Sequence, residues 1–303
     1  MVRTNKNTLL AYYECRQSYS DWAEIDIKVI RSTDGGETWK TVKIIPGNGN
    51  TLNNPVMVVY GDEILFLYCK NYKQLFILKS LDDGINFSDE IEISSVYEKG
   101  GFDYTVAAIG PGHGIVHNGT ILIPAWFAYN KDNPKAHYPS FISVIYSKDN
   151  GATWNIGDVI GKDALKEPGE SALAVTKDNK VLISVRNEEK KRALFYSENG
   201  YSNWSEKHLA ESLTDPCCQG SIDYRDGMLF HINCSHEEVR KNLCIKISDD
   251  GFDTYKEIFI DEEGRYSDIA VSDDTIYVLY ESDVDNDGMY FKAIKNYKFY
   301  MED

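Results

Sequence analysis

Two short segments of the chain carry side chains of the kinds that bind metal ions. His231, Cys234 and His236 lie in H-I-N-C-S-H, a ligand set that suits zinc. That stretch alternates like a strand and lacks a second ligand pair at metal spacing, so zinc is not expected. The acidic run D-V-D-N-D-G at 283–288 resembles part of a calcium loop, but it lacks the glutamate at the twelfth position and the flanking helices. We therefore predict no metal and no other cofactor.

A short motif recurs five times and indicates the elements that must position any active site. The copies are S-T-D-G-G-E-T-W, S-L-D-D-G-I-N-F, S-K-D-N-G-A-T-W, S-E-N-G-Y-S-N-W and S-D-D-G-F-D-T-Y, which begin at Ser32, Ser80, Ser147, Ser197 and Ser248. An Asp or Asn side chain can bond its own backbone two residues on, glycine accepts a positive φ, and the aromatic can be buried beside the next strand. We interpret each copy, here called an Asp box, as a hairpin turn. The last two have glycine one place early and are degenerate copies.

The spacing of the boxes predicts the architecture. Successive serines are 48, 67, 50 and 51 residues apart, and 303 residues accommodate about six such units. Short apolar runs between turn residues fit strands, whereas sustained helical periodicity is scarce. These runs are N-T-L-L-A-Y-Y, E-I-L-F-L-Y, T-I-L-I-P-A-W-F, K-V-L-I-S-V and T-I-Y-V-L-Y. We predict an all-β, six-bladed β-propeller of four-stranded blades over residues 1–303, a single domain, because radial closure protects sheet edges.

Composition and charge exclude several classes of partner. With 48 acidic and 32 basic residues the formal net charge is −16, which argues against nucleic acid and anionic membranes. No run of 18 apolar residues occurs, and residues 1–20 lack the layout of a signal peptide. The six cysteines, with Cys217 and Cys218 adjacent, are too sparse for a disulfide scaffold, so we expect free thiols. We expect a cytoplasmic monomer.

Between the boxes lie segments that carry a family resemblance. The first runs from a strand through E-x-R and S-D-W to a second strand and a box, over residues 7–39. The others are I-G-P-G-H-G-I with I-L-I-P-A-W, E-S-A-L-A-V to S-V-R-N, D-P-C-C-Q-G-S-I with R-K-N-L-C-I-K-I-S, and R-Y-S-D-I-A to V-L-Y-E. In this order they resemble the sialidase (neuraminidase) family of Asp-box, or BNR-repeat, propellers. The resemblance covers most of the chain.

The resemblance implies a retaining exo-α-sialidase that removes terminal α-linked sialic acid from sialylated glycans. Tyr266 matches the family's nucleophile; a phenol starts neutral and avoids the repulsion that a carboxylate would meet beside the sialic acid carboxylate. Glu170 matches the residue that draws off the phenol proton, since an unperturbed tyrosine pKa near 10 requires a base. Glu167 is the alternative. We prefer Glu170 because it enters a strand-like segment and lies 16 residues before Arg186, a spacing that the family also uses.

Asp21 matches the general acid, which protonates the leaving glycosidic oxygen and later activates water. We expect it on a loop between two strands; Asp26 and Glu24 are the alternatives, although Asp26 lies in an alternating strand-like segment.

Three arginines match groups that contact the substrate. Arg186 and Arg240 correspond to two of the arginines that bind the sialic acid carboxylate, a task suited to planar guanidinium groups. Arg16 corresponds to a further substrate-contacting arginine, and Glu281 to the supporting carboxylate that orients the family's first arginine. The competing interpretation is that these arginines are surface residues paired with the abundant acids. The first arginine belongs to an R-I-P segment that this sequence lacks; Arg3 falls too late to replace it.

This departure has two explanations: the chain begins at an internal methionine of a longer protein, or it lacks one of the three carboxylate-binding arginines. We favour the first, because Glu281 would otherwise orient nothing, and in that case a secretion signal could also precede the chain. Two other functions stay open. The same site could act on a related nonulosonic acid or transfer the sugar to another hydroxyl. Alternatively, the chain could be a carbohydrate-binding propeller without catalysis.

Overall fold

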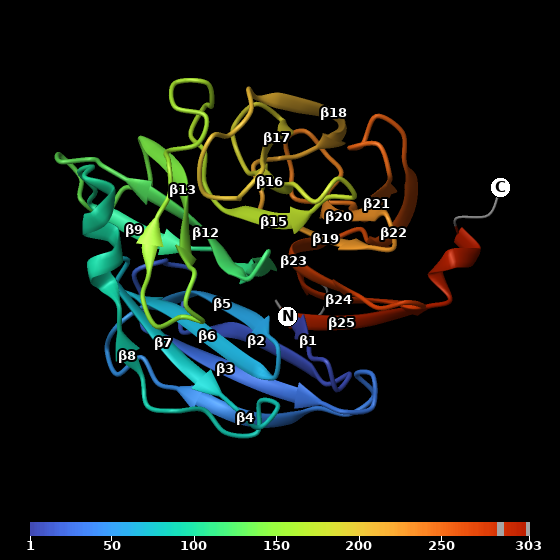
Figure 1. Ribbon diagram of the computed structural model, residues 1–303, viewed down its shortest axis with the longest axis horizontal. Helices are drawn as coiled ribbons and strands as arrows, with labels where there is room; N and C mark the ends of the chain where they lie inside the picture. Colours follow the sequence, from blue (N-terminus) through green and yellow to red (C-terminus); the bar gives the residue numbers. More distant parts are fainter. Residues whose placement is uncertain (284–287, 301–303) are drawn as a thin grey trace. The chain divides into compact units, whose positions relative to one another are not determined.

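The computed structural model describes residues 1–283 and 288–300 of the chain. The acidic run at 283–288 therefore lies largely outside the described residues. The chain divides into two compact units, residues 1–158 and 159–303. In the described part the regular structure is six β-sheets and two short 3-10 helices, η1 (Ser94–Gly100) and η2 (Tyr297–Tyr300), which confirms the predicted all-β class (Figure 1). None of its helices has the length and apolar character needed to cross a membrane.

The first unit holds three sheets. The first sheet comprises β1 (Val2–Arg3), β2 (Leu9–Arg16), β3 (Ile25–Ser32) and β4 (Lys40–Ile45). The second comprises β5 (Leu52–Tyr60), β6 (Glu63–Lys70), β7 (Gln74–Ser80) and β8 (Ile91–Glu92), with β10 (Gly112–His113) parallel to β5. The third comprises β9 (Val106–Ile109), β11 (Ile115–His117), β12 (Thr120–Ala128), β13 (Ser140–Ser147) and β14 (Asn155–Ile156).

The second unit also holds three sheets. The fourth sheet comprises β15 (Ser171–Val175), β16 (Val181–Val185), β17 (Lys191–Ser197) and β18 (His208–Thr214). The fifth comprises β19 (Ser221–Arg225), β20 (Met228–Cys234), β21 (Leu243–Ser248) and β22 (Lys256–Asp261). The sixth comprises β23 (Gly264–Val271), β24 (Thr275–Ser282) and β25 (Gly288–Lys295). The prediction of four strands per sheet is therefore right for three of the six sheets, and the others have five, five and three within the described residues.

The apolar runs of the sequence form strands that lie inside their sheets, with a neighbouring strand on each side. The five runs fall on β2, β6, β12, β16 and β24. Each of these strands pairs with a neighbour on both sides, so its backbone groups are satisfied within the sheet. In β12 every residue after Thr120 is buried. Continuous apolar sequence is what such a strand requires.

The Asp boxes close hairpins, as predicted. In the first box, between β3 and β4, Ser32 Oγ donates to Asp34 Oδ1 at 2.7 Å and accepts from the Gly36 N–H at 2.9 Å. Asp34 also accepts from the Thr38 N–H at 3.0 Å and the Thr38 hydroxyl at 2.6 Å. These bonds hold the pKa of Asp34 at about 2. Each turn is thus locked by its own side chains.

The two boxes with early glycines differ from each other. The fifth keeps the full pattern: Asp250 accepts from the Thr254 N–H at 3.0 Å, and Phe252, with φ +75°, donates to Ser248 Oγ from the place that glycine holds in the first box. Only the fourth box is shortened, with the Gly200 N–H bonded to Ser197 Oγ. The expected burial of the aromatic holds for Trp154, which is 4% exposed, but not for Tyr255, which is 45% exposed.

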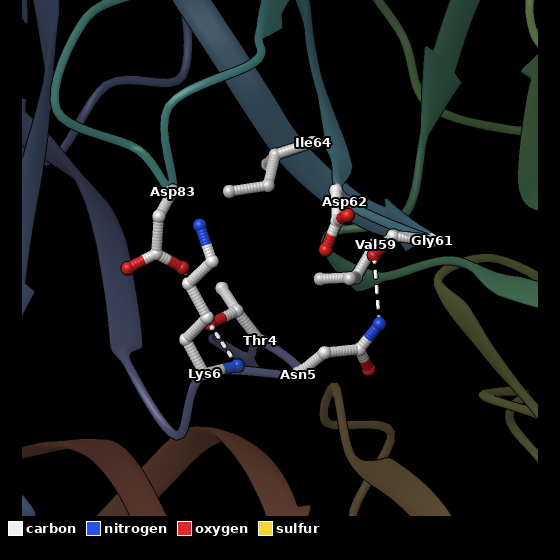
Figure 2. Close-up of a pocket in the computed structure, with 8 residues that line it drawn as sticks. All are labelled: Thr4, Asn5, Lys6, Val59, Gly61, Asp62, Ile64 and Asp83. Carbon is white, nitrogen blue, oxygen red and sulfur yellow. Dashed lines mark hydrogen bonds between the residues drawn. The ribbon is translucent and has the colours of Figure 1, made fainter.

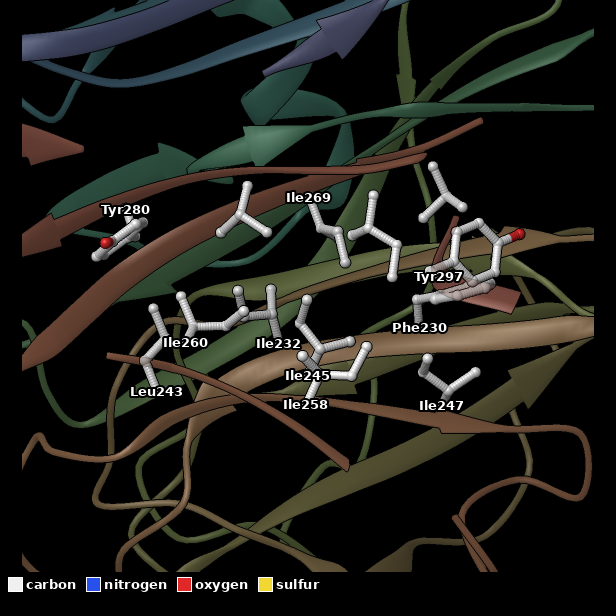
Figure 3. Close-up of a cluster of buried hydrophobic side chains, with 13 residues drawn as sticks. Phe230, Ile232, Leu243, Ile245, Ile247, Ile258, Ile260, Ile269, Tyr280 and Tyr297 are labelled. Atoms are coloured by element: carbon white, nitrogen blue, oxygen red, sulfur yellow. The ribbon is translucent and has the colours of Figure 1, made fainter. Parts of the chain in front are cut away.

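Apolar side chains between neighbouring sheets form the cores. In the second unit, residues of β20, β21 and β22 pack against residues of β23 and β24, and Figure 3 shows these side chains facing one another. The cluster includes Phe230, Ile232, Leu243, Ile245, Ile247, Ile258, Ile260, Ile269, Tyr280 and Tyr297. Full burial of each such side chain stabilises the fold by about 1.5 to 3 kcal/mol.

A polar contact joins the first two sheets of the first unit. Asp83, in the second box, accepts from the hydroxyls of Thr4 and Thr8 and from Arg31 Nη2, each at 2.6 Å. Figure 2 shows Asp83 at the edge of a cavity of about 10 Å³ that Lys6 also lines. Because none of the predicted site residues lines this cavity and its volume suits a single water molecule, it is no candidate for a sugar site.

Candidate active site

A hairpin brings Glu170 and Arg186 together. β15 and β16 are antiparallel, with Ser171 opposite Val185. The pairing continues one step beyond the strands, because the Arg186 N–H donates to the Glu170 carbonyl at 3.1 Å. Glu170 and Arg186 are therefore cross-strand neighbours, and Arg186 Nη1 forms an ion pair with Glu170 Oε2. The spacing of 16 residues between them follows from the length of the hairpin.

Tyr266 reaches this pair from another sheet of the same unit. It lies in β23 where the register with β24 shifts between Gly264 and Ser267, a bulge that can re-aim a side chain. The Tyr266 hydroxyl donates to both carboxylate oxygens of Glu170, at 2.8 and 2.9 Å, and accepts from Arg186 Nη1 at 2.9 Å. Figure 1 shows β15, β19 and β23 side by side, which is how residues 96 positions apart meet.

The surroundings keep the phenol neutral. Burial raises the pKa of Tyr266 well above its ordinary value, the negative charge of Glu170 raises it further, and Arg186 opposes both effects. For Arg186, burial lowers the pKa, but electrostatic interactions with Glu170 and with the hydroxyl of Tyr266 outweigh it, so the pKa is raised and the guanidinium stays charged. Glu170 itself is only 9% exposed. A neutral phenol bonded to a carboxylate is the arrangement of a nucleophile and its base.

Arg240 also lies against the tyrosine. It occupies the loop between β20 and β21, and its guanidinium carbon is 5.4 Å from the centroid of the Tyr266 ring, within cation–π range. Among the described residues it has no hydrogen-bond or ion-pair partner. An arginine without an acidic partner, in a chain of net charge −16, is a favourable anion-binding group. The structure thus brings Glu170, Arg186, Arg240 and Tyr266 together.

In the first unit, Arg16 and Asp21 are in direct contact. Arg16 ends β2, and Asp21 lies on the loop between β2 and β3, as predicted. Arg16 Nη1 donates to Asp21 Oδ1 at 2.8 Å, while its Nη2 is 2.7 Å from Glu14 Oε2. Glu14 is fixed in turn by the Asn54 N–H at 2.8 Å. Burial raises the pKa of Glu14, although its contacts with Arg16 and Asn54 act in the opposite direction.

The environment of Asp21 differs from that of the alternative acids. Its side chain is 45% exposed and lies 4.0 Å from His137 Nδ1. Asp26, in contrast, accepts the Gly47 N–H at 2.7 Å and holds the turn after β4. Glu24 is exposed, and its backbone carbonyl pairs with Gln17. Asp21 and Glu24 thus lie on the same loop, and what distinguishes Asp21 is its hydrogen bond from Arg16.

Glu281 lies on β24 opposite Met289, with an exposed side chain.

Three further residues at these clusters were not predicted from the sequence. Glu14 carried a signal, because it precedes Arg16 by two residues and so shares its face of the strand. His137 and Cys217, which contacts Arg186 as described below, carried none.

Comparison with known proteins places this geometry in a family. The profile of the BNR repeat-like domain matches residues 40–278. The chain belongs to this family. Relatives of this BNR repeat-like chain include a sialidase of Bacteroides fragilis, 27% identical over 97% of the chain and 61% of the relative, and one of Paraclostridium sordellii, 27% identical over 97% and 82%. The solved Hadza microbial sialidase Hz136 is similar at a TM-score of 0.83 and 25% identity, over 97% of the chain and 64% of that structure.

These similarities confirm two of the expectations from the sequence. The fold is the six-bladed β-propeller, and the resemblance to BNR-repeat sialidases, a glycoside hydrolase family, is confirmed. The chain spans somewhat less than two thirds of the length of the Bacteroides relative and of Hz136.

Proposed function

We propose that the chain is a retaining exo-α-sialidase that releases terminal α-linked sialic acid from glycans. The observation that carries the proposal is the pair of hydrogen bonds from the Tyr266 hydroxyl to both oxygens of Glu170, at 2.8 and 2.9 Å. A tyrosine hydroxyl held by a buried carboxylate and an arginine is poised for proton loss toward that carboxylate. The similarity to proteins named sialidases supports the same assignment.

In the first step the Tyr266 oxygen attacks the anomeric carbon while its proton passes to Glu170. The bond from that carbon to the glycosidic oxygen breaks, and Asp21 gives its proton to the departing oxygen. The product is a glycosyl-tyrosine bond, a released alcohol and an ionised Asp21.

In the second step a water molecule attacks the same carbon, and Asp21 takes its proton. The bond to Tyr266 breaks, and Glu170 returns the proton to the phenol oxygen. Two inversions give overall retention, as in other two-step glycosidases.

Arg186 and Arg240 would hold the carboxylate of the sugar. The Nε and Nη1 atoms of Arg186 have protein partners, whereas among the described residues its Nη2 has none, so this nitrogen can donate to a ligand. Arg240 supplies a second cation over the tyrosine ring. Arg16 would contact the substrate beside Asp21, which it also orients.

The test compares Tyr266→Phe with the unmodified protein on a fluorogenic α-sialoside. We expect turnover to fall by at least about 10³-fold, because the nucleophile is lost, while binding of sialic acid by calorimetry persists. The control is Tyr277→Phe, which should retain activity. Tyr277 lies on β24 of the same sheet and its ring stacks on Phe291. An unmodified protein that binds sialic acid without any turnover would instead be a carbohydrate-binding propeller.

The substrate and acceptor are tested in the same assay. Added lactose would yield a sialylated lactose if the enzyme transfers the sugar, and release of a related nonulosonic acid in preference to sialic acid would indicate the other alternative.

A further inference from the structure

A turn of five residues, Asp215–Gln219, contacts both the candidate carboxylate-binding arginine, Arg186, and the strand that carries the candidate nucleophile, Tyr266. It connects β18, the last strand of the fourth sheet, to β19, the first strand of the fifth sheet. At its end, the Ser267 N–H donates to Gln219 Oε1 at 2.9 Å, directly after Tyr266 in the chain. The turn therefore contacts the strand that carries the tyrosine.

The turn is anchored by a buried arginine. Arg192 has a side chain of 0% exposure and lies 3.5 Å from Asp215, whose side chain is 1% exposed. Arg192 Nη1 also donates to the Cys218 carbonyl at 2.9 Å, and Asp215 accepts the Cys218 N–H at 2.9 Å. Ser184 completes the set, because its hydroxyl and carbonyl accept from Arg192 Nε and Nη2 at 3.1 and 3.0 Å. Every nitrogen of this guanidinium is thus bonded to protein.

These anchors impose an uncommon backbone on Cys217. Its φ is +59°, in the left-handed region that residues other than glycine, asparagine and aspartate seldom adopt. Such conformations persist where the surroundings determine them. The result is that Cys217 Sγ accepts a hydrogen bond from Arg186 Nε at 3.4 Å. The thiol is half-buried and forms no disulfide.

The contact fixes Arg186 on the edge opposite Glu170 and Tyr266. Nε is held by Cys217 and Nη1 by Tyr266 and Glu170, so rotation of the planar guanidinium is restrained from two sides. The remaining nitrogen, Nη2, can donate hydrogen bonds to a carboxylate of the substrate.

We propose that Cys217 is a positioning residue, which holds Arg186 in the orientation that binds the substrate carboxylate, and that the Asp215–Gln219 turn anchored by Arg192 exists to present it. This inference rests on the proposed sialidase function. It assigns Cys217 no contact with the substrate; its effect passes through Arg186.

The kinetic test measures kcat and KM of Cys217→Ala and Cys217→Ser on a fluorogenic α-sialoside. The sugar carboxylate is charged in the ground state and in the transition state, so a loosened Arg186 weakens both equally and raises KM. For Cys217→Ala, KM should rise about 5- to 10-fold, with kcat nearly unchanged, because the lost hydrogen bond has a sulfur atom, a weak acceptor, as its partner. Cys217→Ser keeps an acceptor and should restore KM to within about 2-fold of the unmodified value. A merely structural role would lower the amount of folded enzyme, and hence apparent kcat, without changing KM.

Cys244→Ala is the matched control, because this buried cysteine lies on β21 and its thiol forms no hydrogen bond with the site residues described above. Its KM should equal that of the unmodified protein. The proposal is overturned if Cys217→Ala leaves KM unchanged, or if Cys217→Ser raises KM as much as Cys217→Ala does.

A second measurement does not depend on activity. In the ¹⁵N-labelled protein, the Arg186 Nε–H signal is identified by its absence in Arg186→Lys. Its exchange with water should accelerate about 5-fold in Cys217→Ala, the effect of losing one hydrogen bond. If the unmodified protein cleaves no sialoside, the proposed function fails, but the exchange rate still tests the contact between Cys217 and Arg186. A rate that is the same in Cys217→Ala and in the unmodified protein would refute that contact.

Discussion

Glu170→Gln tests the base directly, because the substitution keeps the size of the side chain and removes its charge. In the structure both oxygens of Glu170 accept the Tyr266 hydroxyl, and Oε2 also pairs with Arg186. An amide can accept at one oxygen only and cannot take the phenol proton. Loss of a positioned base typically costs about 10²- to 10⁴-fold in rate, or about 3 to 5 kcal/mol in the barrier.

The pKa of the Tyr266 phenol provides a second measurement for Glu170→Gln, independent of the loss of rate. The Glu170 charge is among the causes that raise the pKa of Tyr266, so Glu170→Gln should lower that pKa while kcat falls. Activity of the variant should then rise with pH, since hydroxide can replace the missing base. We would measure kcat/KM on a fluorogenic α-sialoside from pH 5 to pH 9 and titrate the phenol by ultraviolet difference absorbance.

Glu167→Gln is the control, as the other glutamate of the same segment, and should stay within about 3-fold of the unmodified rate. A kcat/KM for Glu170→Gln within about 10-fold of the unmodified value would refute the assignment of the base.

Three further predictions concern other residues. Asp21→Asn should lose about 10²- to 10⁴-fold on sialyllactose but far less on a substrate whose leaving group departs without protonation; equal losses on both would argue against a general acid. Asp83→Asn leaves Arg31 beside a neutral partner and should destabilise the fold by about 3 to 5 kcal/mol, seen as a lower Tm, whereas Asp62→Asn at the exposed rim of the same cavity should not. Asp149, bonded to Thr153 and Ser147, has a pKa of about 2, below the unfolded value of about 3.9, so its contribution is present above pH 4 and lost toward pH 2. The Tm difference between the unmodified protein and Asp149→Ala should therefore close over that range, and a constant difference would contradict the assignment.

The fold was accessible from the sequence because its signals are local. The Asp boxes specify hairpins through bonds within eight residues, and their spacing of about 50 residues gives the number of sheets. Strand number per sheet was not accessible: β10 adds to β5 through a parallel pairing, and β9 joins β12 across a loop. Phe252 in the fifth box shows a second limit, since a phenylalanine at φ +75° cannot be foreseen from residue preferences.

Glu170 and Arg186 were assigned from the family resemblance, and the hairpin explains why they meet. The 16-residue interval from Glu170 to Arg186 fixes their meeting once β15 and β16 pair. Tyr266 depended on the family resemblance, because its approach to Glu170 is set by packing between sheets and by a bulge. The contact of Cys217 with Arg186 depends on the buried Arg192, which is distant from Cys217 in the sequence, so no local sequence pattern predicts it.

The central claim is that Tyr266 becomes covalently bound to the sugar, and one measurement tests it most directly. The protein is incubated with 2,3-difluorosialic acid, whose fluorine substituents slow the second step, and its peptides are analysed by mass spectrometry. The account predicts a sugar adduct on the peptide that contains Tyr266, absent from Tyr266→Phe. An adduct on a different residue, or rapid sialoside cleavage by Tyr266→Phe, would contradict it.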